Sequence, residues 1–181
     1  MRVPPTPKIF LLSPARCDGR RAKALLNPAA EFPLAVQLRS SEGAPLGEVF
    51  SFLSGLYFRG KLTYARAFAT SETASVIRII TTNRGLLTPE VRVWPSDLDD
   101  FACVDLGDAG DSFEKPLVRD AAELRHALGN VAVAVLLGST ATNKYVGPLG
   151  PVFGEQLHLP REFIGRGDMS RGGLLLRHAD A

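Results

Sequence analysis

Residues 131–137 read VAVAVLL and run directly into Gly138, Ser139 and Thr140. An unbroken apolar run of this length, rich in β-branched valine, is typical of a strand that is covered on both faces. Strands with one face in water alternate apolar and polar residues instead. The stretch therefore predicts a central strand of a parallel sheet.

Two further segments are similar: one is apolar after Lys8, and the other is apolar except for Arg78. Residues 8–12 (KIFLL) end at Ser13 and residues 76–80 (VIRII) end at Thr81, so each predicted strand leads into a polar turn. Helical spacing and stop signals predict helices at 20–26, 46–57, 61–69 and 116–128. Parallel neighbours need such crossover connections. We therefore expect a single α/β domain over residues 1–181, with a three-layer, mostly parallel sheet flanked by helices.

Other segments carry weaker signals. Residues 32–38 are predicted to be extended, and residues 105–114, with two glycines and four acidic residues, to form a solvated loop. The glycine-rich stretch 165–173 (GRGDMSRGG) is predicted to be a loop, and the apolar residues 174–176 that follow it a last short strand.

The length and composition limit the classes of protein to which the chain can belong. The chain has 181 residues, of which 45% are hydrophobic and 22% charged, enough for one sizeable core. Its apolar runs are far shorter than the roughly 20 residues that cross a bilayer, and its first residues do not resemble a secretory signal. We expect a cytoplasmic protein with no membrane partner. Its two cysteines fit no metal-binding spacing, and no nucleotide-cofactor motif is present, so no metal and no cofactor are expected.

Charge is distributed unevenly, although the net charge is only +2. Residues 1–92 hold 13 Lys and Arg against 6 Asp and Glu, whereas residues 93–130 hold 3 against 9. The basic half favours an anionic partner. The acidic stretch 97–114 suggests another role, the docking of a basic protein partner.

Polar residues follow each predicted strand. In a sheet of this kind ligands bind outside the carboxyl ends of the strands, where these loops meet. Arginine and lysine there could hold phosphate oxygens, and hydroxyls and amides could bind sugar or base edges. The alternative is that these are ordinary solvated loops. The candidate ligand-binding residues are Ser13, Arg16, Arg20 and Arg21 in the first loop, Thr82, Asn83 and Arg84 in the second, and Ser139, Thr140, Asn143 and Lys144 in the third.

The stretch 165–173 is a further candidate, because its glycines and Arg166 and Arg171 could close over an anion. Asp18 and Asp168 both lie between arginines, an arrangement that could keep a general base ionised. The simpler interpretations are a connecting loop and two salt-bridged aspartates. Cys17 could be a low-pKa thiol, although a small buried cysteine is the commoner outcome.

Aromatic and basic residues alternate around residue 57. Tyr57, Arg59, Lys61 and Tyr64 could form a surface that stacks on bases and neutralises phosphates. Helical spacing favours the other interpretation, in which the aromatic residues are core and the cations, Lys61 among them, face solvent.

Three short strings resemble small bacterial domains of unknown function related to the YaaA peroxide-stress family. They are LLSPA at 11–15, LYFRGK at 56–61 before YARAF at 64–68, and ITTNRGLL at 80–87. The resemblance covers about the first half of the chain and implies an α/β domain associated with DNA or nucleic-acid modification. Such domains often have a lysine after the Ser-Pro-Ala-type turn, where this chain has Arg16. That difference is compatible with phosphate binding and leaves lysine-dependent chemistry at this turn unsupported.

The sequence thus favours a nucleic-acid- or nucleotide-binding accessory protein of bacterial DNA metabolism, stress or defence. An alternative is a hydrolase or transferase that acts on a nucleotide or nucleobase, with Asp18 or Asp168 as acid or base. A third is a protein-interaction module that uses the acidic stretch 97–114.

Overall fold

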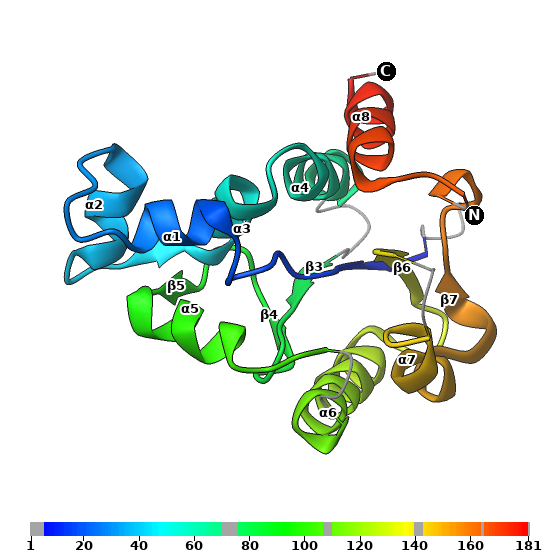
Figure 1. The fold of residues 1–181 in the computed structure, drawn as a ribbon. Helices are drawn as coiled ribbons and strands as arrows, with labels where there is room; N and C mark the ends of the chain where they lie inside the picture. Colours follow the sequence, from blue (N-terminus) through cyan, green and yellow to red (C-terminus); the bar gives the residue numbers. More distant parts are fainter. Residues whose placement is uncertain (1–5, 70–75, 107–109, 140–142, 164, 181) are drawn as a thin grey trace.

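A computed structural model of the chain describes residues 6–69, 76–106, 110–139, 143–163 and 165–180. Strands and helices alternate along most of it (Figure 1). The strands are β1 (Lys8–Leu12), β2 (Ala44–Pro45), β3 (Val76–Ile80), β4 (Leu86–Leu87), β5 (Arg92–Val93), β6 (Val133–Leu137) and β7 (Leu157–His158). The α-helices are α1 (Arg20–Leu26), α2 (Pro33–Arg39), α3 (Leu46–Ser54), α4 (Leu56–Phe68), α5 (Pro95–Ala102), α6 (Gly110–Leu128), α7 (Val146–Phe153) and α8 (Asp168–Ala179). Short 3₁₀ helices span Gly154–Gln156 and Arg161–Phe163.

The main sheet has five strands in the order β4-β3-β1-β6-β7. β1 lies in the middle and pairs in parallel with β3 and β6, with Leu12 opposite both Ile79 and Leu137. β7 continues the parallel order beside β6, and β4 is the single antiparallel strand. The three strands predicted from the sequence are therefore the three central strands. A separate two-stranded ladder joins β2 and β5.

The sheet is covered on both faces, which confirms the expected three-layer α/β fold. Alternate residues of β1 point to opposite sides: Phe10 and Leu12 belong to one buried cluster, and Ile9 and Leu11 to the other. The first cluster packs against α1–α5 and α8 and the second against α6 and α7. In Figure 1, α4 and α8 lie above the sheet and α6 and α7 below it.

The chain reverses its winding direction at β1. It reaches β3 on one side of β1 by way of α4, and then crosses to β6 on the other side by way of α6, which lies on the opposite face. Where the order of parallel strands reverses in this way, the loops after the two neighbouring strands diverge and leave a crevice at the carboxyl edge of the sheet. This is where the fold itself predicts a ligand.

Several local predictions were wrong. Residues 32–38 are helical rather than extended, because Pro33 occupies the first turn of α2 and its apolar residues pack inward. The helix expected over 46–57 ends at Ser54, since Gly55 adopts a φ of 62° and starts a new helix. The last part of the acidic stretch 105–114 already belongs to α6, which begins at Gly110.

The largest error concerns the carboxyl-terminal glycine-rich stretch. From Asp168 onward it is the beginning of α8, and residues 174–176 are helical instead of a strand. The glycines serve close helix packing: a Cβ on Gly172 would lie 2.7 Å from the carbonyl oxygen of Leu56, and one on Gly60 would lie 2.7 Å from that of Gly172. α4 and α8 therefore cross with their backbones in contact.

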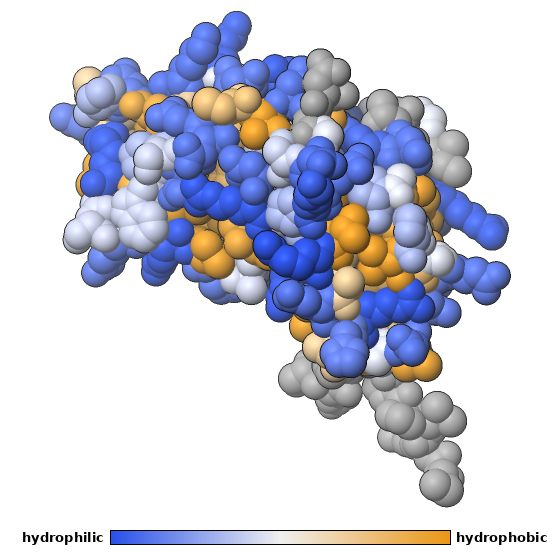
Figure 2. All heavy atoms as spheres, turned by 90° about the horizontal axis from the view of Figure 1, so that it is seen from below, coloured by the Kyte–Doolittle hydropathy of each residue, from blue (hydrophilic) through white to orange (hydrophobic). Residues whose placement is uncertain are grey.

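The outer surface is mixed in character. Seen from the side of α6 and α7, hydrophilic residues cover most of the face, with apolar residues exposed in several areas between them (Figure 2). Among the described helices, none has both the length and the apolar character that a membrane crossing requires.

Candidate ligand-binding crevice

A crevice of about 480 Å³ opens at the carboxyl edge of the sheet. Its walls come from the segments that follow β1, β3 and β6, and from the end of α5. The loops that the sequence predicted to meet therefore do meet. The lining residues are Pro14, Ala15, Arg16, Cys17, Asp18, Thr82, Phe101, Ala102, Val104, Asp105, Leu106, Lys144 and Tyr145.

The loop after β1 forms one wall. Arg16 is exposed and forms an ion pair with Asp18, 2.9 Å between Nη2 and Oδ2. The hydrogen bond from Arg16 lowers the pKa of Asp18, which makes this carboxylate a weak proton acceptor near neutral pH. Arg20 and Arg21 lie outside the lining, on α1, and Arg21 donates to the carbonyl oxygen of Phe52.

The loop after β3 is fastened to α5. Arg84 forms ion pairs with Asp97 and Asp100, at 2.6 and 2.8 Å, and Asn83 donates to the carbonyl oxygen of Asp100. Thr82 donates to the carbonyl oxygen of Phe101 at 2.9 Å and is the member of this loop that lines the crevice. The positive charge of Arg84 is thus already balanced within the protein, and the loop holds α5 in place beside the crevice.

The loop after β6 contributes Lys144 and Tyr145. The ammonium of Lys144 lies 5.1 Å from the centre of the Tyr145 ring, at the crevice. Tyr145 is buried, and this burial raises the pKa of its hydroxyl, which therefore stays protonated. Ser139 and Asn143 are described but do not line the crevice, and Thr140 lies outside the described residues.

The residues of the glycine-rich stretch do not reach this crevice. Arg166 is exposed and donates to Ser170. Arg171 is only 6% exposed; its Nε donates to the carbonyl oxygen of Phe163, and its Nη1 lies 3.3 Å from Asp168. The two arginines that were predicted to act together on an anion thus have different surroundings.

Sequence reasoning missed the most unusual group near the crevice. Lys61 was predicted to face solvent, yet it is 1% exposed, and its Nζ donates to the carbonyl oxygen of Ser13 at 2.7 Å and to the Ser13 hydroxyl at 2.8 Å. Burial is the main reason that the pKa of Lys61 falls to about 7; the charge of Arg171 also lowers it, and Asp168 opposes both. One signal was present in the sequence: Lys61 follows Tyr57 by four residues and so shares its buried helix face.

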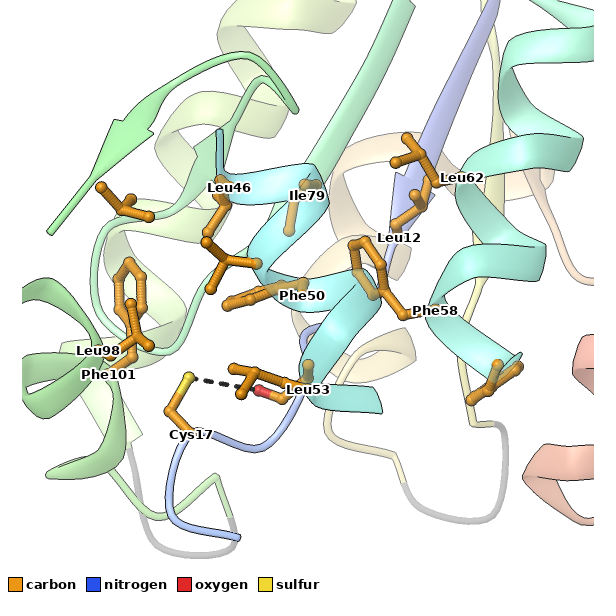
Figure 3. Close-up of a cluster of buried hydrophobic side chains, with 14 of the residues drawn as sticks. Leu12, Cys17, Leu46, Phe50, Leu53, Phe58, Leu62, Ile79, Leu98 and Phe101 are labelled. Carbon is orange, nitrogen blue, oxygen red and sulfur yellow. Dashed lines mark hydrogen bonds between the residues drawn. The ribbon is translucent and has the colours of Figure 1, made fainter. Parts of the chain in front are cut away.

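Cys17 points away from solvent, into the first core cluster (Figure 3). Its thiol contacts the carbonyl oxygen of Ala15, with Sγ and O 3.7 Å apart, and burial raises the pKa of the thiol to about 12. The hypothesis of a low-pKa thiol is wrong, because the thiolate is the reactive form and burial disfavours it.

We expect iodoacetamide to alkylate Cys103 and to spare Cys17 in the native protein. Cys103 is exposed, whereas Cys17 is buried and protonated at neutral pH. Peptide mass spectrometry before and after denaturation checks this, since urea should make both thiols react. Rapid alkylation of native Cys17 would show that the wall of the crevice opens.

The part of the chain that the structure describes contains no group of three or more His, Cys, Asp or Glu that could hold a metal ion. Comparisons with protein-family models, curated proteins and solved structures found no significant match. The function must therefore be inferred from the crevice and the groups around it.

Proposed function

We propose that this protein binds a nucleotide in the crevice at the carboxyl edge of its sheet, as an accessory protein of bacterial DNA metabolism, stress or defence. The observation that carries the proposal is the position of the crevice, between the loops of β1, β3 and β6 at the strand where the winding reverses. Its volume of about 480 Å³ is within the range of small-molecule sites.

The lining suits the parts of a nucleotide. Phe101 and Tyr145 supply aromatic surface for a base, and Lys144 supplies a positive charge for phosphate. Thr82, Asp18 and Asp105 add groups that can hydrogen-bond to a sugar or to base nitrogens. Aromatic, hydroxyl and charged groups thus surround one space of suitable size.

A nucleic-acid strand is the second candidate. Arg16, Arg20 and Arg21 are all exposed on the segment from the end of β1 into α1, beside the crevice. A strand could place one nucleotide in the crevice and lay its backbone along these arginines. The mononucleotide is favoured because Arg16, Arg21 and Arg84 already have protein partners.

The interaction-module hypothesis has less support. Asp97 and Asp100, at the start of the acidic stretch, are partners of Arg84. Their charge is therefore partly balanced within the protein, which leaves less of it for a basic partner.

Replacing Lys144 by glutamine is expected to weaken nucleotide binding about tenfold or more. A hydrogen bond to a charged group contributes about 1.5–3 kcal/mol, and about 1.4 kcal/mol corresponds to a factor of ten. Titration calorimetry with AMP, GMP, CMP and UMP measures the effect. Lys115→Gln is the matched control, because Lys115 is exposed on α6, pairs with Asp111 and does not line the crevice.

The titrations also separate the two candidates. Binding of at least one mononucleotide, lost in Lys144→Gln and kept in Lys115→Gln, supports the proposal. Binding of an oligonucleotide alone, with an affinity that falls steeply as salt rises, would favour the nucleic-acid strand. Absence of binding to either ligand at low salt would reject both.

A further inference from the structure

Ser13 and Lys61 form a buried pair at the carboxyl end of the central strand. Ser13 is 5% exposed and does not itself line the crevice, but it directly follows β1 and directly precedes Pro14 and Ala15 of the crevice wall. Lys61 reaches it from α4, with Nζ 2.8 Å from the serine Oγ. The two side chains come from positions 48 residues apart, so the contact depends on the fold.

The surroundings of Lys61 favour a neutral amine. Among the described residues Lys61 has no carboxylate ion-pair partner, and its Nζ lies 4.3 Å from the centre of the Tyr57 ring and 4.9 Å from that of Phe58. Burying an unpaired ammonium is costly, and a lysine in such a site readily loses its proton. A neutral amine can donate to the Ser13 carbonyl oxygen and accept from the Ser13 hydroxyl at the same time.

Charged and polar groups of α4 and α8 lie around the pair. Arg171 of α8 is buried near Lys61, and Asp168, its ion-pair partner, is exposed. The hydroxyl of Tyr57 is buried and has no hydrogen bond of normal geometry to any described residue, and the nearby Arg171 lowers its pKa against the larger effect of burial. On the other side of Ser13, Gly138 has no side chain, and a Cβ there would lie 3.0 Å from the Ser13 Cβ.

We propose that Ser13 is a nucleophile and Lys61 its general base, and that the pair cleaves a phosphoester of the nucleotide bound in the crevice. This inference rests on the proposed function. A nucleophile within hydrogen-bond reach of a basic side chain is the arrangement that activates a hydroxyl, and serine–lysine pairs are one known form of it. The hypothesis that Asp18 or Asp168 acts as the base is not needed, since both are paired with arginine.

The reaction has two steps. Ser13 Oγ forms a bond to phosphorus while the bond from phosphorus to the leaving alcohol oxygen breaks; the serine proton passes to Lys61 Nζ and from there to the leaving oxygen. Water then attacks the phosphoserine, its hydroxyl stays on phosphorus, the bond between Oγ and phosphorus breaks, and the remaining proton returns to Ser13. Water is the only co-reactant, and nothing is oxidised or reduced.

The test uses a small dialkyl fluorophosphate, which reacts with activated serines without a natural substrate. Ser13 Oγ would bond to phosphorus, fluoride would leave with the bonding electrons, and Lys61 would take the proton. We expect one adduct per chain, located at Ser13 by peptide mass spectrometry. Its rate should rise with pH about the lysine pKa of about 7, because only the neutral amine accepts a proton.

The charged and titratable groups that face Lys61 are Asp168 and Arg171 of α8 and Tyr57 of α4. Burial raises the pKa of Tyr57 to about 12, so its hydroxyl does not titrate near neutral pH. A midpoint near pH 7 in the pH dependence of the labelling rate would therefore be assigned to Lys61.

Variants separate a general base from a structural lysine. Ser13→Ala should abolish the adduct. Lys61→Arg keeps a cation that donates hydrogen bonds but cannot accept a proton, and should slow labelling at neutral pH about 100-fold or more. Ser51→Ala is the matched control: this hydroxyl bonds to the carbonyl oxygen of Gly47, away from the crevice, and labelling should be unchanged.

Absence of an adduct at Ser13 in the folded wild-type protein would overturn the inference. So would Lys61→Arg labelling as fast as wild type, because the lysine would then be only structural. Mononucleotide binding without Ser13 labelling would reject the serine–lysine pair and keep the proposed function. Labelling of Ser13 in a protein that binds no nucleotide would keep the activated serine and reject the nucleotide as its substrate.

Discussion

Replacing Phe101 by alanine is expected to lower the free energy of unfolding by about 3–5 kcal/mol, the usual cost of truncating a buried aromatic residue. Phe101 is 2% exposed, and its ring lies edge-on to Phe50 at 6.1 Å between centres. The guanidinium of Arg84 lies 5.1 Å from its ring centre. Phe101 also lines the crevice, so the same change should also weaken nucleotide binding by the molecules that remain folded.

Phe50→Ala is the matched control for this prediction. Phe50 is 1% exposed and packs edge-on against Phe58, yet it does not line the crevice. Urea denaturation should show a loss of stability of similar size, about 3–5 kcal/mol, while affinity per folded molecule should fall only in Phe101→Ala. Equal losses of affinity in the two variants would mean that Phe101 shapes the wall without touching the ligand.

The central strands could be predicted because their signal is local. A strand buried on both faces needs a mostly apolar run: residues 9–12 and 133–137 are apolar throughout, and residues 76–80 are apolar except for Arg78. The helices between these segments predicted that the strands are parallel, since parallel neighbours need crossovers, but they did not predict the order of the strands. The loops after the three strands were therefore expected at one edge of the sheet, and residues of all three loops do line one crevice there.

The carboxyl-terminal helix could not be predicted in this way. Gly172 and Gly173 have low helix propensity, and a loop is the natural interpretation of two adjacent glycines. The helix forms because tertiary contact with α4 outweighs that propensity, and the partner of Gly172 is Gly60, 112 positions earlier. No pattern within a local window contains that information.

The candidate site, too, could be predicted from the sequence only in part. Residue types and loop positions predicted polar groups around one crevice, and Thr82 and Lys144 do lie there. Which charged side chains are available to a ligand depends on ion pairs with residues distant in the sequence. Arg84, for example, is paired with Asp97 and Asp100 of α5. Lys61 differs again, because a lysine on a helix is normally exposed, and only the packing of α4 against β1 buries this one.

Gly172→Ala is expected to destabilise the protein by about 1–3 kcal/mol, the usual cost of inserting a group into packed surroundings. Its Cβ would lie 2.7 Å from the carbonyl oxygen of Leu56 and 2.9 Å from the Cα of Tyr57, both backbone atoms that cannot move aside. α8 would have to separate from α4, which would also carry Arg171 away from Tyr57 and Lys61. Thermal and urea denaturation measure the first effect, and fluorophosphate labelling of Ser13 the second.

The neighbouring glycine gives the opposite expectation. At Gly173 the nearest atom to an added Cβ is the end of the Arg177 side chain at 3.6 Å, which is ordinary contact with a group that can move. Alanine there should stabilise the protein by about 0.5–1 kcal/mol, because it is the better helix former. A loss of stability in Gly173→Ala equal to that in Gly172→Ala would mean that this turn is not helical in solution. Opposite signs would establish that α8 is a helix and that its backbone is in contact with α4 at Gly172.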